Sequence, residues 1–92
     1  MIQVKRLVLD ILKPHQPNAL DFARAIAAQG ADYRVHLTVQ EVDEKTESIQ
    51  LVIEGNDIQF EAVAETISSH GASLHSIDEV EVCSHSHPGS GE

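Results

Sequence analysis

The chain has few of the residues that mark small disulfide scaffolds and base-stacking domains. It has no tryptophan, one cysteine (Cys83), and three aromatic residues: Phe22, Tyr33 and Phe60. A single cysteine cannot form a disulfide within the chain, and it cannot supply the paired thiols of a copper chaperone. RNA-recognition domains stack bases on aromatic rings of their central strands, and both phenylalanines fall in segments with a helical pattern. These absences exclude all three classes of protein.

Positive charge is also scarce. The chain has 6 Lys and Arg residues against 15 Asp and Glu residues, a net charge of -9 at pH 7. Binding to phosphate backbones needs Lys and Arg, so we expect no nucleic-acid partner. No apolar run approaches the roughly 20 residues that cross a bilayer, and residues 1–6 lack the layout of a signal peptide. We therefore expect no membrane insertion and a cytoplasmic location.

The hydrophobic pattern predicts four strands and two helices. Strands are expected at 2–12, 33–40, 49–53 and 74–82, and helices at 17–29 and between 57 and 70. Gly30 is expected as the C-cap of the first helix, Asn56 or Asp57 as the N-cap of the second, and Gly71 as its end. Leu74 and Ile77 are three residues apart, which predicts a β-bulge near His75 and Ser76.

The order strand, helix, strand, strand, helix, strand predicts an α+β, ferredoxin-like fold. Right-handed crossovers give a four-stranded antiparallel sheet in the order 4-1-3-2, with both helices on one face. The open face then carries charged and valine side chains from three strands, a mixture that indicates contact with another subunit. These open-face residues are Arg6, Val8, Asp10, His36, Thr38, Gln40, Val52 and Glu54.

The end of the chain suggests a metal site. Cys83, His85 and His87 alternate, and alternate side chains of an extended segment leave from the same face. A thiolate and two neutral imidazoles suit zinc, nickel or copper. We therefore predict a ferredoxin-like domain over residues 1–82 and a flexible metal-binding tail over residues 83–92. The alternative is a mobile chain end whose histidines bind nothing.

A second cation or ligand site is predicted on the first and last strands. Its residues are Asp10, His75, Asp78 and Glu79. Asp10 lies in an apolar strand, where a carboxylate needs a partner. We expect an ion pair with Lys13 or Arg6, and the alternative joins Asp10 to His75 as a ligand site.

Three further groups have simpler interpretations. His15 lies in a loop between two prolines, and we expect it to be hydrogen-bonded to the backbone at the surface. Asp57 is expected to cap a helix rather than bind a metal. The acidic residues of the hairpin, Glu47 among them, are expected to be solvated charge that protects strand edges.

Three segments of the chain resemble a known family. Residues 9–15 (LDILKPH), 54–57 (EGND) and 73–80 (SLHSIDEV) are similar to the signature segments of the small, mainly archaeal domain-of-unknown-function family 211. The resemblance covers about residues 2–82. It implies a ferredoxin-like fold and assembly into closed homo-oligomers, and it implies no established activity.

These observations give two functional hypotheses. The first is a non-enzymatic, self-assembling domain that senses, buffers or delivers a soft divalent metal held by Cys83, His85 and His87. The second is a regulatory or scaffolding homo-oligomer that binds a small metabolite or a protein between subunits. No catalytic motif is present, so an enzyme is not expected.

Overall fold

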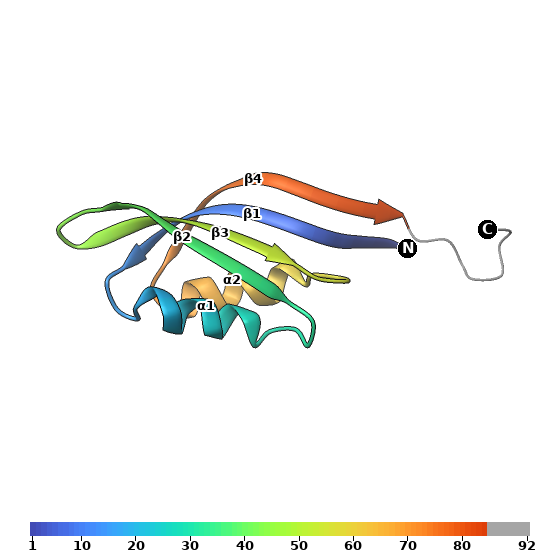
Figure 1. Cartoon of the computed structure of the whole chain (residues 1–92), viewed down its shortest axis with the longest axis horizontal. Helices are drawn as coiled ribbons and strands as arrows, with labels where there is room; N and C mark the ends of the chain where they lie inside the picture. Colours follow the sequence, from blue (N-terminus) through green and yellow to red (C-terminus); the bar gives the residue numbers. More distant parts are fainter. Residues whose placement is uncertain (85–92) are drawn as a thin grey trace, which may run out of the picture.

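The computed structural model describes residues 1–84, which form one sheet covered on one face by two helices (Figure 1). The elements are β1 (Ile2–Pro14), α1 (Ala19–Ala27), β2 (Arg34–Val42), β3 (Thr46–Glu54), α2 (Phe60–Ser69) and β4 (Ser73–Ser84). All neighbouring strands are antiparallel, and their order is β2-β3-β1-β4. This confirms the predicted ferredoxin-like fold and its strand order.

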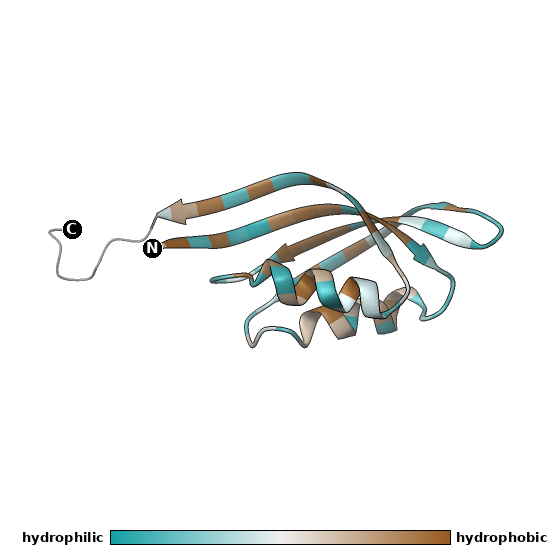
Figure 2. Ribbon diagram, turned by 180° about the vertical axis from the view of Figure 1, so that it is seen from behind, coloured by the Kyte–Doolittle hydropathy of each residue, from teal (hydrophilic) through white to brown (hydrophobic). Residues whose placement is uncertain are grey.

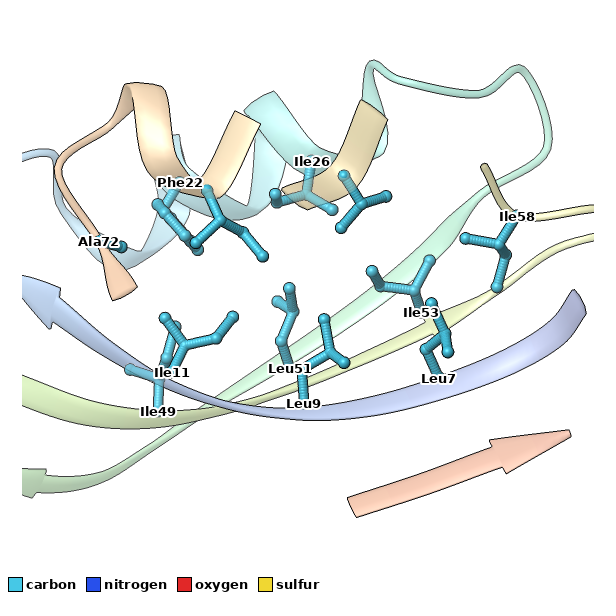
Figure 3. Close-up of a cluster of buried hydrophobic side chains, with 12 residues drawn as sticks. Leu7, Leu9, Ile11, Phe22, Ile26, Ile49, Leu51, Ile53, Ile58 and Ala72 are labelled. Carbon is cyan, nitrogen blue, oxygen red and sulfur yellow. The ribbon is translucent and has the colours of Figure 1, made fainter. Parts of the chain in front are cut away.

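The hydrophobic core lies between the sheet and the helices (Figure 3). Alternate residues of β1 and β3 point toward the helices, because successive side chains of a strand leave from opposite faces. Each fully buried aliphatic or aromatic side chain contributes about 1.5–3 kcal/mol relative to the exposed state. The core side chains are Leu7, Leu9, Ile11, Phe22, Ile26, Ile49, Leu51, Ile53, Ile58, Val63, Ile67 and Ala72.

Helix α1 is shorter than predicted at both ends. Asn18 is its N-cap, and the Asn18 side chain accepts a hydrogen bond from the backbone N–H of Asp21 at 2.8 Å. The predicted C-cap at Gly30 is wrong, because the helix ends at Ala27 and Ala28 is its C-cap. Gly30 is needed for another reason: a Cβ there would clash with the ring of Tyr33. Neither helix in the described residues has the length and apolar character to cross a bilayer.

Helix α2 begins later than predicted, so the expected N-cap at Asn56 or Asp57 is wrong. Its N-cap is Gln59, whose side chain makes no capping hydrogen bond. Ile58 lies before the helix, because its side chain enters the core and its backbone N–H donates to the carbonyl of Val4 at 2.8 Å. The Asp57 carboxylate accepts instead from the backbone N–H of Val4 at 3.2 Å. Asp57 therefore joins the loop to β1.

Strand β4 contains two bulges. His75 lies between the pairs Leu74 to Ile11 and Ser76 to Asp10, so it is an extra residue and the predicted bulge is confirmed. Asp78 is a second extra residue, between Ile77 and Glu79. The bulges keep apolar residues three apart on the helix-facing side. Gly71, with φ +80°, lies just after α2 as predicted.

Candidate functional site

The predicted tail site lies mostly outside the described residues. Cys83 is in β4, opposite Gln3 of β1, and its free thiol is exposed. His85 and His87 lie beyond residue 84, so their position relative to Cys83 stays a prediction. Within residues 1–84, no three His, Cys, Asp or Glu side chains lie close enough together to hold a metal ion.

The residues of the second predicted site lie along the β1–β4 pair. Asp10 is opposite Ser76, and Glu79 is opposite Val8, so Asp10 and Glu79 share the open face of the sheet. The Asp78 carboxylate accepts a hydrogen bond from the Ser76 hydroxyl at 2.7 Å. Glu79 pairs with Arg6 at 3.1 Å. Asp78 and Glu79 thus already have protein partners, and a ligand role for the site stays a prediction.

The expected ion pair of Asp10 with Lys13 or Arg6 is wrong. Lys13 is an odd number of residues from Asp10, so the two side chains leave from opposite faces of β1. Arg6 shares the face of Asp10, but its guanidinium binds Glu54 and Glu79. Within residues 1–84, the half-buried carboxylate of Asp10 forms no ion pair.

A buried charged cluster lies where β1 ends. The side chain of Lys13 is fully buried and lies on the core side of the sheet, two residues after Ile11. Its ammonium donates to the carbonyls of Pro14 at 2.8 Å and Pro17 at 2.6 Å, and it lies 3.1 Å from Glu47 Oε1. An ammonium has three N–H donors, so Lys13 is fully satisfied. It ties the β1–α1 loop to β3.

His15 completes this cluster at the surface. Its Nδ1 lies 3.3 Å from Glu47 Oε2, and its Nε2 lies 3.0 Å from the carbonyl oxygens of both Asp43 and Glu44. The predicted backbone hydrogen bonding of His15 is therefore confirmed. The β1–α1 loop and the turn between β2 and β3, which His15 joins, lie at the end of the sheet opposite the N-terminus (Figure 1).

The cluster shifts the pKa values of its two outer members. Hydrogen bonds to the Glu44 carbonyl and to Glu47 raise the pKa of His15 above its usual value. Partial burial opposes ionisation of Glu47, but hydrogen bonds from Lys13 and His15 outweigh it and lower the pKa of that carboxyl. Both shifts favour the charged forms.

This cluster is not among the sites predicted from the sequence. The prediction that Glu47 is solvated surface charge is wrong, because the Glu47 side chain is only 14% exposed. A signal was present. Lys13 follows Ile11 at a period of two, which places it on the core face, and the β1–β3 register sets Glu47 directly opposite it.

A second feature that the sequence pattern did not predict is an exposed apolar strip on the ribbon formed by β1 and β4. The two strands extend together beyond the helices (Figure 1), with hydrophobic and hydrophilic bands along them (Figure 2). The cross-strand pairs place the apolar side chains on the helix-facing side. The strip consists of Ile2 (63% exposed), Ile77 (48%), Val80 (55%) and Val82 (57%).

Comparison with known proteins assigns the chain to a family. The model of the family DUF211, described as uncharacterized ArCR, matches residues 5–86. The chain is 44% identical over 77 residues to the uncharacterized protein MJ0319 of Methanocaldococcus jannaschii, covering 84% of this chain and 79% of that protein. The matched region contains β2, β3, β4 and both helices. The chain therefore belongs to the DUF211 family, as its three signature segments indicated.

Proposed function

We propose that the protein is a non-enzymatic module that assembles with further copies of itself through the edge of β4 and the apolar strip. The observation that carries this proposal is the strip of Ile2, Ile77, Val80 and Val82, each at least 48% exposed. Apolar side chains gathered on one face of an edge ribbon are typical of an interaction surface. The outer edge of β4, which pairs with no other strand of residues 1–84, offers backbone donors and acceptors to another strand.

Charge on the open face supports a contact between unlike edges. The cross-strand pairs place Glu81, Arg6, Glu54 and Arg34 in one row across the sheet, with alternating sign from β4 to β2. If β4 of one copy lies beside β2 of the next, Glu81 follows Arg34 and the alternation continues. A symmetric contact between two β4 strands would instead bring two acidic edges together, which is unfavourable.

The same arrangement covers the apolar strip. Both helices lie on one face of the sheet, so a copy that extends the sheet beyond β4 adds its own helices on the side of the strip. A contact between unlike edges is heterologous, and copies joined in this way close into a ring when the rotation between them permits. A closed ring leaves no free sheet edge.

Assembly is tested by native mass spectrometry and light scattering of the full chain. The wild type is expected to be a closed oligomer, and Val80→Asp is expected to give monomers because it places a charge in the strip. Lys45→Ala makes the same change in net charge at the turn between β2 and β3, and it should leave assembly intact. A monomeric wild type, or an oligomer that Val80→Asp leaves unchanged, would contradict the proposal.

The edge pairing has its own test. Arg34→Glu should weaken assembly, because it opposes Glu81 of the neighbouring copy with a like charge. Adding Glu81→Arg in the same chain should restore part of the assembly. If the double variant is as dissociated as Arg34→Glu alone, β4 does not pair with β2.

We further propose that a soft divalent metal binds Cys83 together with His85 and His87. The support is the free, exposed thiol near the end of β4 and the alternate spacing of the two histidines after it. In an assembled ring this site would be repeated, which raises the apparent affinity of a weak three-ligand site. Such a protein would sense, buffer or deliver the metal.

Titration with Zn²⁺ by calorimetry tests this second proposal. The full chain should bind near-stoichiometric zinc, and Cys83→Ser should lose that binding while the oligomer remains. Replacement of Ser86 by alanine is the matched control and should change neither. No uptake of Zn²⁺, Ni²⁺ or Cu²⁺ by the full chain would refute the metal site. A scaffold for a metabolite or protein between subunits would then be the remaining hypothesis.

A further inference from the structure

We propose that His15 is a proton-sensitive clasp that holds the turn between β2 and β3 against the β1–α1 loop. The clasp is closed when the imidazole carries two protons and loosens when it loses one. The inference rests on the atoms around the ring and is independent of the proposed assembly.

The geometry around the ring requires two donors. Nε2 faces the carbonyl oxygens of Asp43 and Glu44, each at 3.0 Å, and carbonyls only accept hydrogen bonds. Nδ1 faces a carboxylate oxygen of Glu47 at 3.3 Å, which also accepts. A neutral imidazole has one N–H, so one nitrogen would turn a lone pair toward an acceptor. The imidazolium satisfies both sides.

The neighbouring charges keep this arrangement in place. On β3, Glu47 contacts the ring, and its other oxygen is held by Lys13 of β1 at 3.1 Å. In the turn, Asp43 and Glu44 contact the ring through their backbone carbonyls. Lys13 is fully buried and bound to two loop carbonyls, so Glu47 cannot follow the ring without breaking a buried ion pair. The turn is therefore the part free to respond.

The direction of the pH effect follows from the raised pKa of His15. A raised folded-state pKa stabilises the fold fully below the ordinary histidine value of 6.5, and this contribution is lost as the pH rises through the higher folded value. The clasp is thus closed in mildly acidic solution and opens as the pH rises through the raised pKa of His15. The turn should become more mobile as it opens.

NMR titration of the full chain from pH 5 to 9 tests the clasp. The His15 ring should titrate with a midpoint above 6.5, and the backbone amides of Asp43, Glu44 and Lys45 should shift and exchange faster with the same midpoint. His15→Gln should remove this step from the turn amides. His36→Gln, which removes an exposed histidine of β2, is the matched control and should leave the step in place.

Two results would overturn the proposal. One is a His15 midpoint at or below 6.5, which would mean that the ring is neutral between its acceptors. The other is a set of turn amides that do not follow the His15 midpoint, or that still show the step in His15→Gln. As a separate readout, Glu47→Gln should lower the His15 midpoint, an effect that a purely structural role of Glu47 would not produce.

Discussion

The two ends of β1 meet opposite surroundings. Near Pro14, the strand ends in charged groups, yet Lys13 is fully buried and each of its three donors has a partner within the same chain. Near Ile2, the helix-facing side of the strand is apolar, yet Ile2 and the neighbouring Val82 of β4 are exposed. The groups of the polar end have their partners within one chain, and the exposed apolar end is the surface of the proposed assembly. Exposure, rather than polarity, is therefore what distinguishes the two ends.

The largest expected effect compares a covered and an uncovered apolar residue of the sheet. Leu51→Ala should lower the free energy of unfolding by about 3–4 kcal/mol, because it leaves a cavity under the helices. Val80→Ala, in the exposed strip, should cost less than about 1 kcal/mol in the dissociated protein. Urea unfolding at one low protein concentration measures both. Equal losses would mean that the strip belongs to the monomer core.

The next effect concerns the charged end. Lys13→Ala should cost about 3 kcal/mol, because it removes one partner of a buried ion pair and leaves two loop carbonyls and Glu47 without their donor. Lys45→Ala, in the exposed turn, should change the free energy of unfolding by no more than about 0.5 kcal/mol. Urea midpoints of the two variants give the comparison. A small loss for Lys13→Ala would show that the cluster tolerates water.

A backbone effect follows at Gly71, which lies beside Pro14 at the charged end. Gly71→Ala should cost about 1 kcal/mol, because φ +80° is unfavourable for a residue with a Cβ. The nearest atom to that Cβ, at 3.6 Å, is an ordinary contact, so crowding adds nothing. Gly71→Asn should cost less, since asparagine tolerates the left-handed region. Thermal unfolding of the two variants tests this. If crowding were the cause, asparagine, the larger side chain, would destabilise the protein more than alanine.

The smallest expected effect is the loss of folding stability as the pH falls below 5. Glu47 has a lowered folded-state pKa, so its contribution is present above the ordinary value of 4.5 and is lost as the pH falls through the lower folded value. Between pH 5 and 3, wild-type urea midpoints should therefore fall more steeply than those of Glu47→Gln. Glu61→Gln, on the exposed side of α2, should leave the wild-type slope unchanged. If the urea midpoints of wild type and Glu47→Gln fall equally with pH, Glu47 does not contribute to acid unfolding.

The local patterns in the sequence were sufficient for much of the fold. Period-two alternation identified the β2–β3 hairpin, and the spacing of Leu74 and Ile77 revealed the bulge at His75. The same spacing recurs between Ile77 and Val80, and it marks the second bulge at Asp78. Helix ends were predicted less well. The N-cap of α2 moved to Gln59 because the burial of Ile58 outweighed the capping preference of Asn56 and Asp57.

The candidate sites depended more on tertiary structure. Lys13 and Arg6 were predicted as partners of Asp10 because they are close to it in sequence. Lys13 lies on the opposite face of β1, and Arg6 pairs with Glu54 and Glu79 instead. The cluster around Lys13 joins residues more than thirty positions apart in sequence through the β1–β3 register. Cys83, His85 and His87 remain a prediction from sequence spacing alone.

Fold class, strand order and family could be predicted from the sequence, because periodicity and signature segments are properties of short stretches of chain. Which charges are buried and which apolar residues are exposed depended on the tertiary structure. The sequence next to Lys13 does not indicate how its charge is paired. Its partners, Glu47 and two loop carbonyls, are brought to it by the fold. Val80 follows a core-like pattern and lies opposite the buried Leu7, but it is itself 55% exposed on the edge strand. Burial depends on what the remainder of the chain places over a residue, and no local pattern encodes that.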